Sequence, residues 1–504
     1  MLRFKRDYFV VDIDDQNALL FLTGNHRLFR ISRELGDRLR LGPEHLEPQE
    51  RDAWQGLSER GAFSDENREL LATSSFEDGA DLAINVNLTN ICNLACTYCF
   101  ADGGDYGRIT NAMGEESVGW IFDFIAANVT PSRRVRFEFF GGEPLANYKT
   151  MRDICEKSVA FAAEHDVEFV YRVSTNLTLL PKGAVELFAE HRFIVSVSLD
   201  GGRAVQDANR PSKNGRGSFD RIIANVREVR AAGDDVTLVA RMTIAQREPT
   251  LIDSVRELWE LNLFDYFQIY PGVFPADVTT AVPVTVTMGN RELVPASSRR
   301  VVNFFLRDGM VEQFRNFLTS YPSLFTAGNR FKGVLEYERT IQMVAEGLFA
   351  LSFCSGGRTY FTHSPDSSIS SCHRLVGDQS FDVGTGPEGL TRPPADWRTT
   401  VDSHPVCGGC WARYVCGGGC KQENFADTGD IATLNTDSCQ YQLLLTEEVL
   451  RLIGRSQPEY LEQDRSPFAD LFVSCGRPTM ANNRGEIHLD ERLTRLFAPV
   501  GGVR

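Results

Sequence analysis

Apolar and polar positions follow a repeating rhythm through the middle of the chain. Six short, nearly continuous apolar runs recur between Leu82 and Tyr270, and amphipathic stretches with helical spacing separate them. Such runs are typical of strands that are buried on both faces of a sheet. The expected strands are 82–88, 134–140, 168–174, 193–199, 236–244 and 266–270, and the expected helices are 115–128, 150–165, 182–191, 218–232 and 250–262. Strands and helices in strict alternation predict a parallel sheet with right-handed crossovers.

Six strand–helix units are fewer than the eight that close a full barrel. We therefore expect an α/β fold over residues 80–345, a partial (β/α)6 barrel that stays open on one side and could admit a bulky substrate. Folds of this kind place their chemistry just beyond the carboxyl ends of the strands. The loops after the first and second strands are therefore the first places to search for a site.

The flanking segments follow other patterns. Residues 1–72 predict a small α+β domain: "YFVVDID" and "ALLFLTG" resemble strands, "HRLFRISRELGDRLRL" has helical periodicity up to Gly42-Pro43, and a polar linker follows. Within residues 271–345, the stretch 275–290 ("PADVTTAVPVTVTMGN") indicates a loop or hairpin, and the rest is mostly helical. Residues 346–450 are rich in Cys and Gly with little periodicity, so something other than a large core must hold them together. Residues 451–504 form a C-terminal extension without a clear pattern.

Charge and cysteine content narrow the functional class. The net charge of −15 argues against broad nucleic-acid binding, which depends on Lys and Arg. No apolar run approaches the ~20 residues that span a bilayer, and no secretory signal opens the sequence. We therefore expect a cytoplasmic protein without nucleic-acid or membrane partners. Twelve cysteines are unusual in that compartment, where disulfides do not persist, so clustered thiols indicate metal binding or catalysis.

The first cysteine cluster follows the first expected strand. The stretch "NICNLACTYCFADGG" places Cys92, Cys96 and Cys99 within eight residues. A [4Fe–4S] cluster is normally held by four thiolates, so three would leave one iron with an open coordination position. An open position is where a metal site acts on a bound ligand. A fragment of a structural zinc site remains the alternative.

The second expected strand ends in a glycine turn, Gly141-Gly142-Glu143-Pro144. Two adjacent glycines let a backbone approach a ligand closely, and exposed carbonyl groups at a strand edge could hold an amine. A Gly-Gly turn by itself is a weak signal, because most such pairs only make turns.

Together these two motifs resemble those of the radical S-adenosylmethionine (SAM) enzymes. Cys92-x3-Cys96-x2-Cys99, with the aromatic Tyr98 before the last cysteine, resembles the signature of that family, and Gly141–Pro144 resembles its motif for the methionine amine. The resemblance implies a partial barrel and a cluster whose open iron chelates SAM. It also implies reductive cleavage of SAM to a 5′-deoxyadenosyl radical that abstracts hydrogen from the substrate.

The resemblance extends to residues at later strand ends. It implies that Ser174, Asn176, Ser198 and Asp200 face the SAM ribose or the substrate. It also suggests that Arg241 pairs with the SAM carboxylate. Polar residues at ordinary strand ends are the alternative for each of them.

A second group of cysteines lies in the C-terminal half. The run Cys407-x2-Cys410-x5-Cys416-x3-Cys420 is followed by Cys439 and preceded by Cys354 and Cys372. These are too many for one zinc ion, although two zinc sites stay possible. The arrangement resembles the SPASM extension, which carries two auxiliary [4Fe–4S] clusters. The resemblance assigns Cys407, Cys410, Cys416 and Cys439 to one cluster and Cys354, Cys372 and Cys420 to the other.

The second of these clusters departs from the family pattern. Ser367 occupies a position where the family usually has Gly, and only three cysteines are assigned. Either this cluster also keeps an open iron, or another residue completes it, for which Cys475 is a candidate. Cys155 lies on an expected helix and is interpreted as an inert core thiol.

The front segment also resembles a known element, the small winged-helix-like domain with which peptide maturases bind a leader peptide as an added strand. The combined resemblance predicts an oxidoreductase-type radical SAM maturase that forms a thioether or carbon–carbon cross-link in a ribosomal peptide. Its expected cofactors are three [4Fe–4S] clusters and SAM. Its expected partners are a precursor peptide with a leader and an electron donor such as flavodoxin or ferredoxin.

Several alternatives remain open at this point. The front segment could be a structural extension that packs on the barrel. The enzyme could be a sulfatase-type maturase that makes formylglycine, or a radical SAM enzyme for a small molecule. A non-enzymatic iron–sulfur electron carrier or a zinc-stabilised scaffold is a further class, although neither would need the Gly141–Pro144 turn or an open three-cysteine loop.

Overall fold

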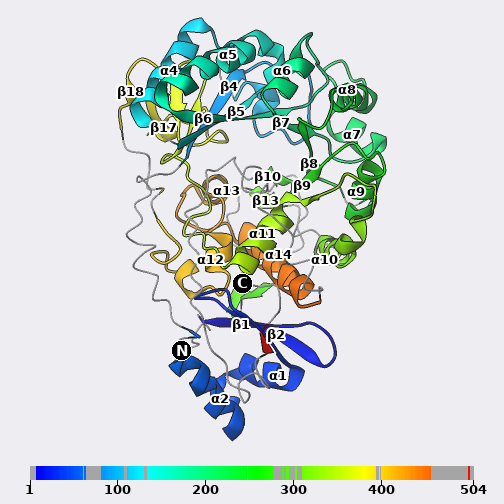
Figure 1. Cartoon of the computed structure of the whole chain (residues 1–504), viewed down its shortest axis with the longest axis vertical. Helices are drawn as coiled ribbons and strands as arrows, with labels where there is room; N and C mark the ends of the chain where they lie inside the picture. The colour runs from blue at the N-terminus through cyan, green and yellow to red at the C-terminus, as the bar shows by residue number, and fades with distance from the viewer. Residues whose placement is uncertain are drawn as a thin grey trace.

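The computed structural model describes residues 7–60, 62–63, 81–106, 111–129, 133–246, 248–275, 286–288, 291–293, 301–303, 309–392, 397, 399–455 and 498–499. The expectation for Cys475 lies outside these residues. Figure 1 shows the barrel at one end of the molecule, the front domain at the other and the cysteine-rich region between them.

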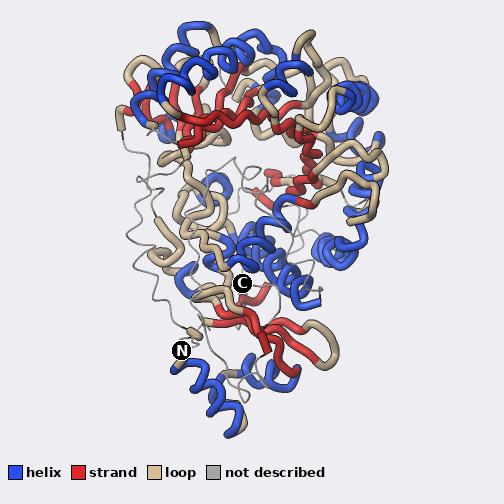
Figure 2. Tube along the Cα trace, viewed as in Figure 1, coloured by secondary structure: helices blue, strands red, loops and turns tan. Residues whose placement is uncertain are grey.

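The six expected strands are confirmed to within one residue at each end. They pair in parallel and in chain order: β4 (Leu82–Thr89), β5 (Arg133–Gly141), β6 (Val167–Thr175), β7 (Ile194–Ser198), β8 (Thr237–Ile244) and β9 (Tyr266–Pro271). Figure 2 shows them as a curved wall with helices on the outer side, and the wall does not close. The predicted α/β fold class is therefore correct.

The helices on the outer side also match the apolar pattern. They are α4 (Glu115–Asn128), α5 (Tyr148–His165), α6 (Ala184–Glu190), α8 (Phe219–Ala231) and α9 (Leu251–Trp259). The short helix α7 (Arg203–Asn209) was not expected. Alternate strand residues such as Phe137 and Phe139 join the core beneath these helices, whereas Glu138 between them faces inward. The inner wall of the barrel is consequently polar.

The cysteine-rich region continues the barrel sheet. β15 (Tyr360–His363) pairs in parallel with β4, and β16 (Ser368–Ser370), β17 (Asp382–Thr385) and β18 (Gly389–Leu390) follow in antiparallel order. At the opposite edge, β14 (Gly333–Val334) pairs with β9. Ser367 precedes β16 with a φ of 64°. This left-handed conformation costs a non-glycine residue about 1 kcal/mol, which explains why glycine suits the position.

Small apolar clusters surround the C-terminal cysteines instead of one large core. Cys407 packs with Phe349, Val401 and Tyr414, whereas Cys354 belongs to a separate cluster around Trp397. The other elements of this half are η8 (Cys407–Gly409), α10 (Met310–Ser320), α11 (Leu335–Glu346), α12 (Arg413–Cys416), α13 (Lys421–Thr428), α14 (Thr436–Arg455) and the pairs β10 (Val273–Pro275)–β13 (Val301–Asn303) and β11 (Val286–Met288)–β12 (Arg291–Leu293).

The front domain is a small antiparallel sheet with two helices. Its elements are β1 (Tyr8–Asp12), β2 (Asn17–Leu22), β3 (Leu28–Ser32), α1 (Arg33–Leu41) and α2 (Pro48–Glu59). The expectation of helical periodicity from His26 is wrong in its first half, because Leu28–Ser32 alternates in burial and pairs with β2. The helix begins only after Ser32, whose hydroxyl accepts a hydrogen bond from the Leu35 N–H at 3.2 Å.

The two faces of this sheet have different partners. One face packs on α1 and α2. The other joins the main core, where α14 contacts β1 and β2, and the Phe9 ring stacks on Trp411 with centroids 3.8 Å apart. The front domain therefore docks on the cysteine-rich region and α14, not on the barrel wall (Figure 1). No helix in the described part of the chain is long and apolar enough to cross a membrane.

Candidate active site

The three-cysteine loop leaves the carboxyl end of β4 and is held by main-chain bonds. The N–H of Ala95 donates to the Pro211 carbonyl at 2.8 Å, and that of Thr97 donates to the Asn209 carbonyl at 3.0 Å. Both acceptors lie at or just beyond the end of α7. The unexpected short helix thus supplies the platform on which the cysteine loop rests.

The Gly-Gly turn packs directly against the same loop. The Gly142 N–H donates to the Thr89 carbonyl at 2.7 Å, and the Glu143 N–H donates to the Ile91 carbonyl at 2.8 Å. A Cβ added at Gly141 would lie 2.3 Å from the Thr89 oxygen, and one at Gly142 would lie 2.4 Å from the Ile91 oxygen. Sequence reasoning expected these glycines to admit a ligand, and the structure shows that they admit the backbone of the cysteine loop.

Glu143 connects this turn to the next strand. Its carboxylate is buried and accepts hydrogen bonds from the Thr175 hydroxyl (2.6 Å) and from the N–H groups of Asn176 (2.8 Å) and Leu145 (3.0 Å). Burial raises the pKa of Glu143 to about 7, and these three donors oppose the rise. Pro144 then opens the short helix η3 (Pro144–Asn147). Glu143 is therefore a positioning group between the ends of β5 and β6.

Asn176 extends the same network to the cysteines. Its amide donates to the Asn93 side chain at 3.0 Å and lies 3.8 Å from the Cys92 sulfur. Thr178 completes the connection, because its hydroxyl accepts from the Asn93 amide at 2.7 Å and donates to Asn176 at 2.6 Å. The end of β6 therefore adjoins one predicted metal ligand.

Asp200 lies at the centre of a second network. It is fully buried and accepts two hydrogen bonds from Arg210, at 2.9 and 3.1 Å, and one from the Thr243 N–H at 2.9 Å. The Tyr98 hydroxyl also donates to it, and the Arg210 guanidinium lies over the Tyr98 ring. The side chains of Asp200 and Tyr98 are thus occupied by each other and by Arg210, so the structure gives both a role in fixing the cysteine loop.

Ser174, Ser198 and Arg241 lie on the strands of the barrel wall. Ser198 and Arg241 are partners in the register of β7 and β8, and Ser174 pairs with Ser196. The Arg241 guanidinium lies 5.9 Å from the centroid of the Phe140 ring, and Arg241 is one of three arginines that act on the buried Glu138 carboxylate. Burial lowers the pKa of Arg241, and nearby arginines reinforce this shift. A partly buried positive charge of this kind is suited to bind a carboxylate.

The ten motif cysteines fall into three groups, in which neighbouring thiols raise one another's pKa. We call Cys92, Cys96 and Cys99 the front thiols, Cys354, Cys372 and Cys420 the near auxiliary thiols, and Cys407, Cys410, Cys416 and Cys439 the far auxiliary thiols. The family resemblance implies the same three sets, and their role as cluster ligands stays a prediction. Cys155 lies apart from all three, fully buried in the main core.

Burial raises the pKa of most of these thiols, among them Cys96, Cys372 and Cys407. It raises the pKa of Cys96 to about 11 and those of Cys372 and Cys407 to about 12. Arg210 opposes the rise at Cys96, and Lys213 does so at Cys92. A metal would have to supply the positive charge that converts these groups to thiolates.

Among the described residues, no three His, Cys, Asp or Glu side chains form a group that could hold a single metal ion. In an iron–sulfur cluster each thiolate binds a different iron, whereas a structural zinc site gathers its ligands around one ion.

The near auxiliary thiols adjoin the front loop. Arg374 donates to Glu423 at 3.0 Å and to the Cys420 sulfur at 4.0 Å, and its guanidinium lies 5.6 Å from the centroid of the Phe100 ring. Phe100 directly follows Cys99. The front and near thiols therefore share one shell of side chains.

Sequence reasoning missed Tyr106, which lies in this shared shell. Its hydroxyl is buried near the Asn87 side chain, and its pKa is raised by burial and by the thiols of Cys99 and Cys372. Its φ of 56° is unusual for a bulky residue. The only signal available in the sequence was an aromatic residue shortly after the cysteine loop.

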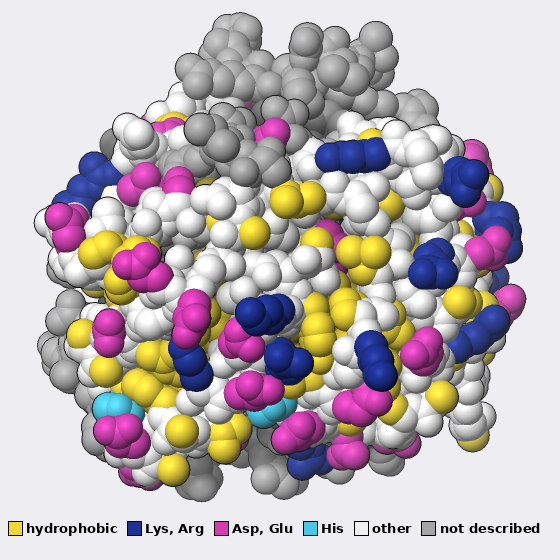
Figure 3. Space-filling view, turned by 90° about the horizontal axis from the view of Figure 1, so that it is seen from above, with side chains coloured by type: hydrophobic (Ala, Val, Ile, Leu, Met, Phe, Trp, Pro, Cys, Tyr) yellow, Lys and Arg dark blue, Asp and Glu magenta, His cyan; other side chains and the backbone are white. Residues whose placement is uncertain are grey.

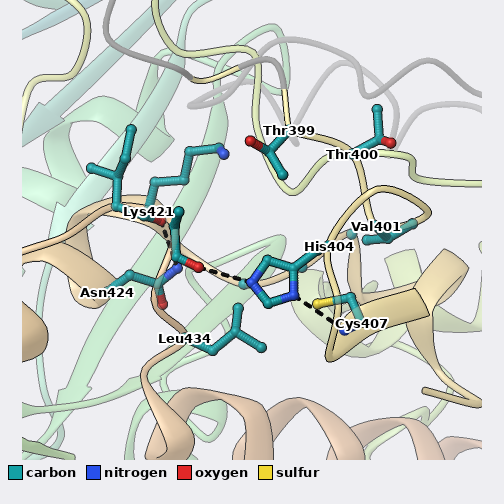
Figure 4. Close-up of a pocket in the computed structure, with 13 residues that line it drawn as sticks. Thr399, Thr400, Val401, His404, Cys407, Lys421, Asn424 and Leu434 are labelled. Carbon is teal, nitrogen blue, oxygen red and sulfur yellow. Dashed lines mark hydrogen bonds between the residues drawn. The ribbon is translucent and has the colours of Figure 1, made fainter. Parts of the chain in front are cut away.

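The far auxiliary thiols have a different support. The N–H groups of Val406 and Cys407 both donate to His404 Nδ1 at 3.2 Å, so Nε2 carries the proton and donates to the Ala432 carbonyl at 2.8 Å. Figure 4 shows His404 between these partners in a small pocket that is also lined by Lys421 and Asn424. His404 thus fixes the main chain at the first far thiol.

On the face of the molecule in Figure 3, acidic and basic side chains are interspersed over the outer helices.

Comparisons with known proteins agree with the geometry. The model of the radical SAM superfamily matches residues 86–249. The chain is 35% identical over 133 residues to a serine-type anaerobic sulfatase-maturating enzyme of Klebsiella aerogenes and 25% identical over 195 residues to a cysteine-type enzyme of Clostridium novyi. These matches cover 25% and 36% of this chain and only 31% and 49% of the relatives.

Solved structures extend the likeness in fold. Native anSMEcpe with bound AdoMet covers 74% of this chain and 98% of its own, at 18% identity and a TM-score of 0.54. SuiB of Streptococcus suis bound to the precursor peptide SuiA covers 87% of this chain and 100% of its own at 15% identity, but its TM-score of 0.47 is too low to establish a common fold. Residues 86–249 therefore form a domain that matches the radical SAM superfamily, and the likeness of fold extends beyond it.

Proposed function

We propose that this enzyme is a maturase that cross-links a ribosomal precursor peptide through a thioether or carbon–carbon bond. Three [4Fe–4S] clusters would be held by the front, near and far thiols, with SAM at the front cluster. When bound, the front cluster and SAM supply a 5′-deoxyadenosyl radical that abstracts hydrogen from the peptide. An electron donor such as flavodoxin or ferredoxin would provide the reducing electron. We place the enzyme in the cytoplasm.

The observation that carries this proposal is the shared shell between the front and near thiols. The thiols of Cys99 and Cys372 both raise the pKa of Tyr106. Arg374 contacts both the Cys420 sulfur and the Phe100 ring. A substrate attacked beside the front thiols would therefore lie next to a second metal group. Such a neighbour could accept an electron or bind a cysteine sulfur of the substrate, and either event suits a cross-linking reaction.

The residues of the chain have distinct tasks in this scheme. Gly141 and Gly142 let the turn lie against the cysteine loop, and Glu143 fixes the turn to β6. Arg241 offers its partly buried charge to the SAM carboxylate. Ser174, Asn176 and Ser198 stay proposed contacts for the ribose or the substrate. The polar inner wall of the open barrel would receive the peptide.

A peptide substrate has two further supports. The front domain presents a small sheet to which an extended peptide could add a strand. A protein of the same fold, anSMEcpe, has been solved with AdoMet and the Cp18Cys peptide.

The relatives favour a second candidate, a sulfatase-type maturase that oxidises Cys or Ser to formylglycine. The front domain speaks against it, since such an enzyme reads a short motif without a leader. Anaerobic incubation with SAM, reductant and the Cp18Cys peptide separates the two proposals. Conversion of the cysteine to an aldehyde, seen by mass spectrometry, would establish the second candidate. Loss of two hydrogens from a co-expressed precursor peptide, without an aldehyde, would establish the first.

Metal content gives the first prediction. Because three all-sulfur groups are present, anaerobic reconstitution is expected to yield about 12 irons per chain, four for each cluster. Iron and acid-labile sulfide analysis measures this value. Replacing Cys416 with Ala should lower it to about 8, because the far cluster loses a ligand. Tightly bound zinc in place of iron would refute the auxiliary clusters.

A second prediction concerns the Gly-Gly turn. Gly142→Ala places a methyl group 2.4 Å from the Ile91 carbonyl oxygen, so the cysteine loop must move. We expect SAM cleavage to fall at least ~100-fold, since displacements of about 1 Å at a reacting centre have effects of this size. The assay is 5′-deoxyadenosine formation measured by chromatography.

Gly119→Ala is the matched control. Gly119 lies within α4, and a Cβ added there meets no atom within 4 Å. The substitution should leave SAM cleavage unchanged and stabilise the helix by about 0.5–1 kcal/mol. Equal activity of the two variants would contradict the role assigned to Gly142.

A further inference from the structure

The sheet of the front domain has a fourth strand that comes from the other end of the chain. β19 (Ala498–Pro499) pairs antiparallel with β3, with Ala498 opposite Arg30 and Pro499 opposite Phe29. The sheet order is β1-β2-β3-β19. The edge of β3 is therefore occupied by a segment nearly 470 residues away in the sequence.

The register shows which main-chain groups this strand uses. The Arg27 carbonyl accepts from the Leu22 N–H at 2.9 Å, so in the antiparallel pattern Phe29 also directs its main-chain groups toward β2, and Arg30 directs its groups outward. Ala498 lies opposite Arg30 and can pair with it. Pro499 lies opposite Phe29, where no outward group needs a donor, so its missing N–H costs nothing.

The other edge of the sheet is less accessible to an added strand. At β1, the Asp12 carbonyl accepts from Arg451 at 3.3 Å, and the next carbonyl, of Ile13, accepts from Arg455 at 2.8 Å. Both arginines lie on α14, and Phe9 is covered by Trp411. β3 is consequently the edge at which an extended peptide could add.

We propose that the C-terminal strand Ala498–Pro499 is a built-in occupant of this peptide-binding edge, which an incoming leader strand must displace. Displacement of this strand by a leader rests on the proposed function as a peptide maturase. Occupation of the β3 edge by Ala498–Pro499 does not depend on that function. A strand of two residues pairs mainly through the main chain, as an added peptide would, and can exchange with it. The Arg30 side chain is anchored to the Gly454 carbonyl at 2.7 Å, which ties β3 to α14 independently of β19.

The test needs no knowledge of the natural substrate. A fluorescein-labelled peptide with the sequence of residues 490–504, "DERLTRLFAPVGGVR", serves as the probe, and fluorescence anisotropy measures its binding. A chain that ends at Leu496 should bind the probe at least ~10-fold more tightly than the full chain, because its β3 edge is open. The full-length variant Ala498→Pro, which lacks the pairing N–H, should also gain binding without being shortened.

Matched controls separate strand addition from other binding. The probe with an N-methyl group on the residue equivalent to Ala498 should not bind the shortened chain. In that chain, Arg30→Pro should abolish binding, whereas Arg30→Ala, which keeps the main-chain N–H, should retain it. Equal binding by the full and shortened chains, or none by either opened variant, would overturn the proposal. The assay uses neither SAM nor a modified product, so its result is independent of the proposed reaction.

Discussion

Replacing Cys96 with Ala is expected to abolish SAM cleavage. Cys96 is the middle front thiol, and the main-chain bonds of its neighbours Ala95 and Thr97 fix its position on the platform after α7. Without it, the front cluster would keep only two protein ligands. We expect 5′-deoxyadenosine formation to fall at least ~1,000-fold, because the chemistry resides in the cofactor.

The same variant should leave the auxiliary groups intact. The near and far thiols lie on other segments, so bound iron should fall from about 12 to about 8 per chain and not to zero. Cys155→Ala is the control, because this thiol is buried in the main apolar core, apart from the three thiol groups. It should keep full iron content at a stability cost of about 1 kcal/mol. Retained SAM cleavage by the Cys96 variant would refute the assignment of the front thiols.

The barrel was predictable because short runs rich in apolar residues recur along the chain and alternate with amphipathic stretches of helical spacing. Runs such as "RVRFEFF" are recognisable without any long-range information, and all six strands were found to within one residue. The secondary structure of the front domain was harder to predict from the sequence. The apolar residues of Leu28–Ser32 fit a helix when they are read together with α1, and they fit a strand when they are read alone. Only pairing with β2 decides between them, and that contact cannot be read from a local pattern.

For the cysteines too, local spacing could be read from the sequence, whereas contacts between distant segments could not. Spacing was sufficient to find each motif, but the resemblance to a known family was needed to interleave Cys420 with Cys354 and Cys372. Attachment of this region to the barrel through β15 could not be foreseen, because a four-residue strand beside β4 has no distinctive sequence. Tyr106 was missed for a related reason, since only the fold brings it beside both Cys99 and Cys372.

Asp200 illustrates how a polar strand end can be misread. Sequence reasoning expected it to face the ribose or the substrate, because polar residues at strand ends in such barrels often contact ligands. The structure shows a fully buried carboxylate whose oxygens are taken by Arg210, Tyr98 and the Thr243 N–H. Its effect on the reaction would therefore be indirect, through the position of Tyr98 between Cys96 and Cys99.

Asp200→Asn is accordingly expected to destabilise the fold and the front cluster together. The Asn amide is neutral, so it cannot balance the charge of Arg210. Its NH2 group would also replace one carboxylate oxygen and face N–H or O–H donors in place of an acceptor. Removing one partner of a buried ion pair costs about 3–5 kcal/mol. Asp220→Asn is the matched control, because the Arg203–Asp220 pair is exposed, with side-chain exposures of 58% and 72%, and solvent screening should make its loss nearly neutral for stability. Anaerobic thermal unfolding gives both values, and iron analysis should show about four irons lost only from the Asp200 variant. If both variants unfold alike and cleave SAM equally well, Asp200 does not support the cysteine loop.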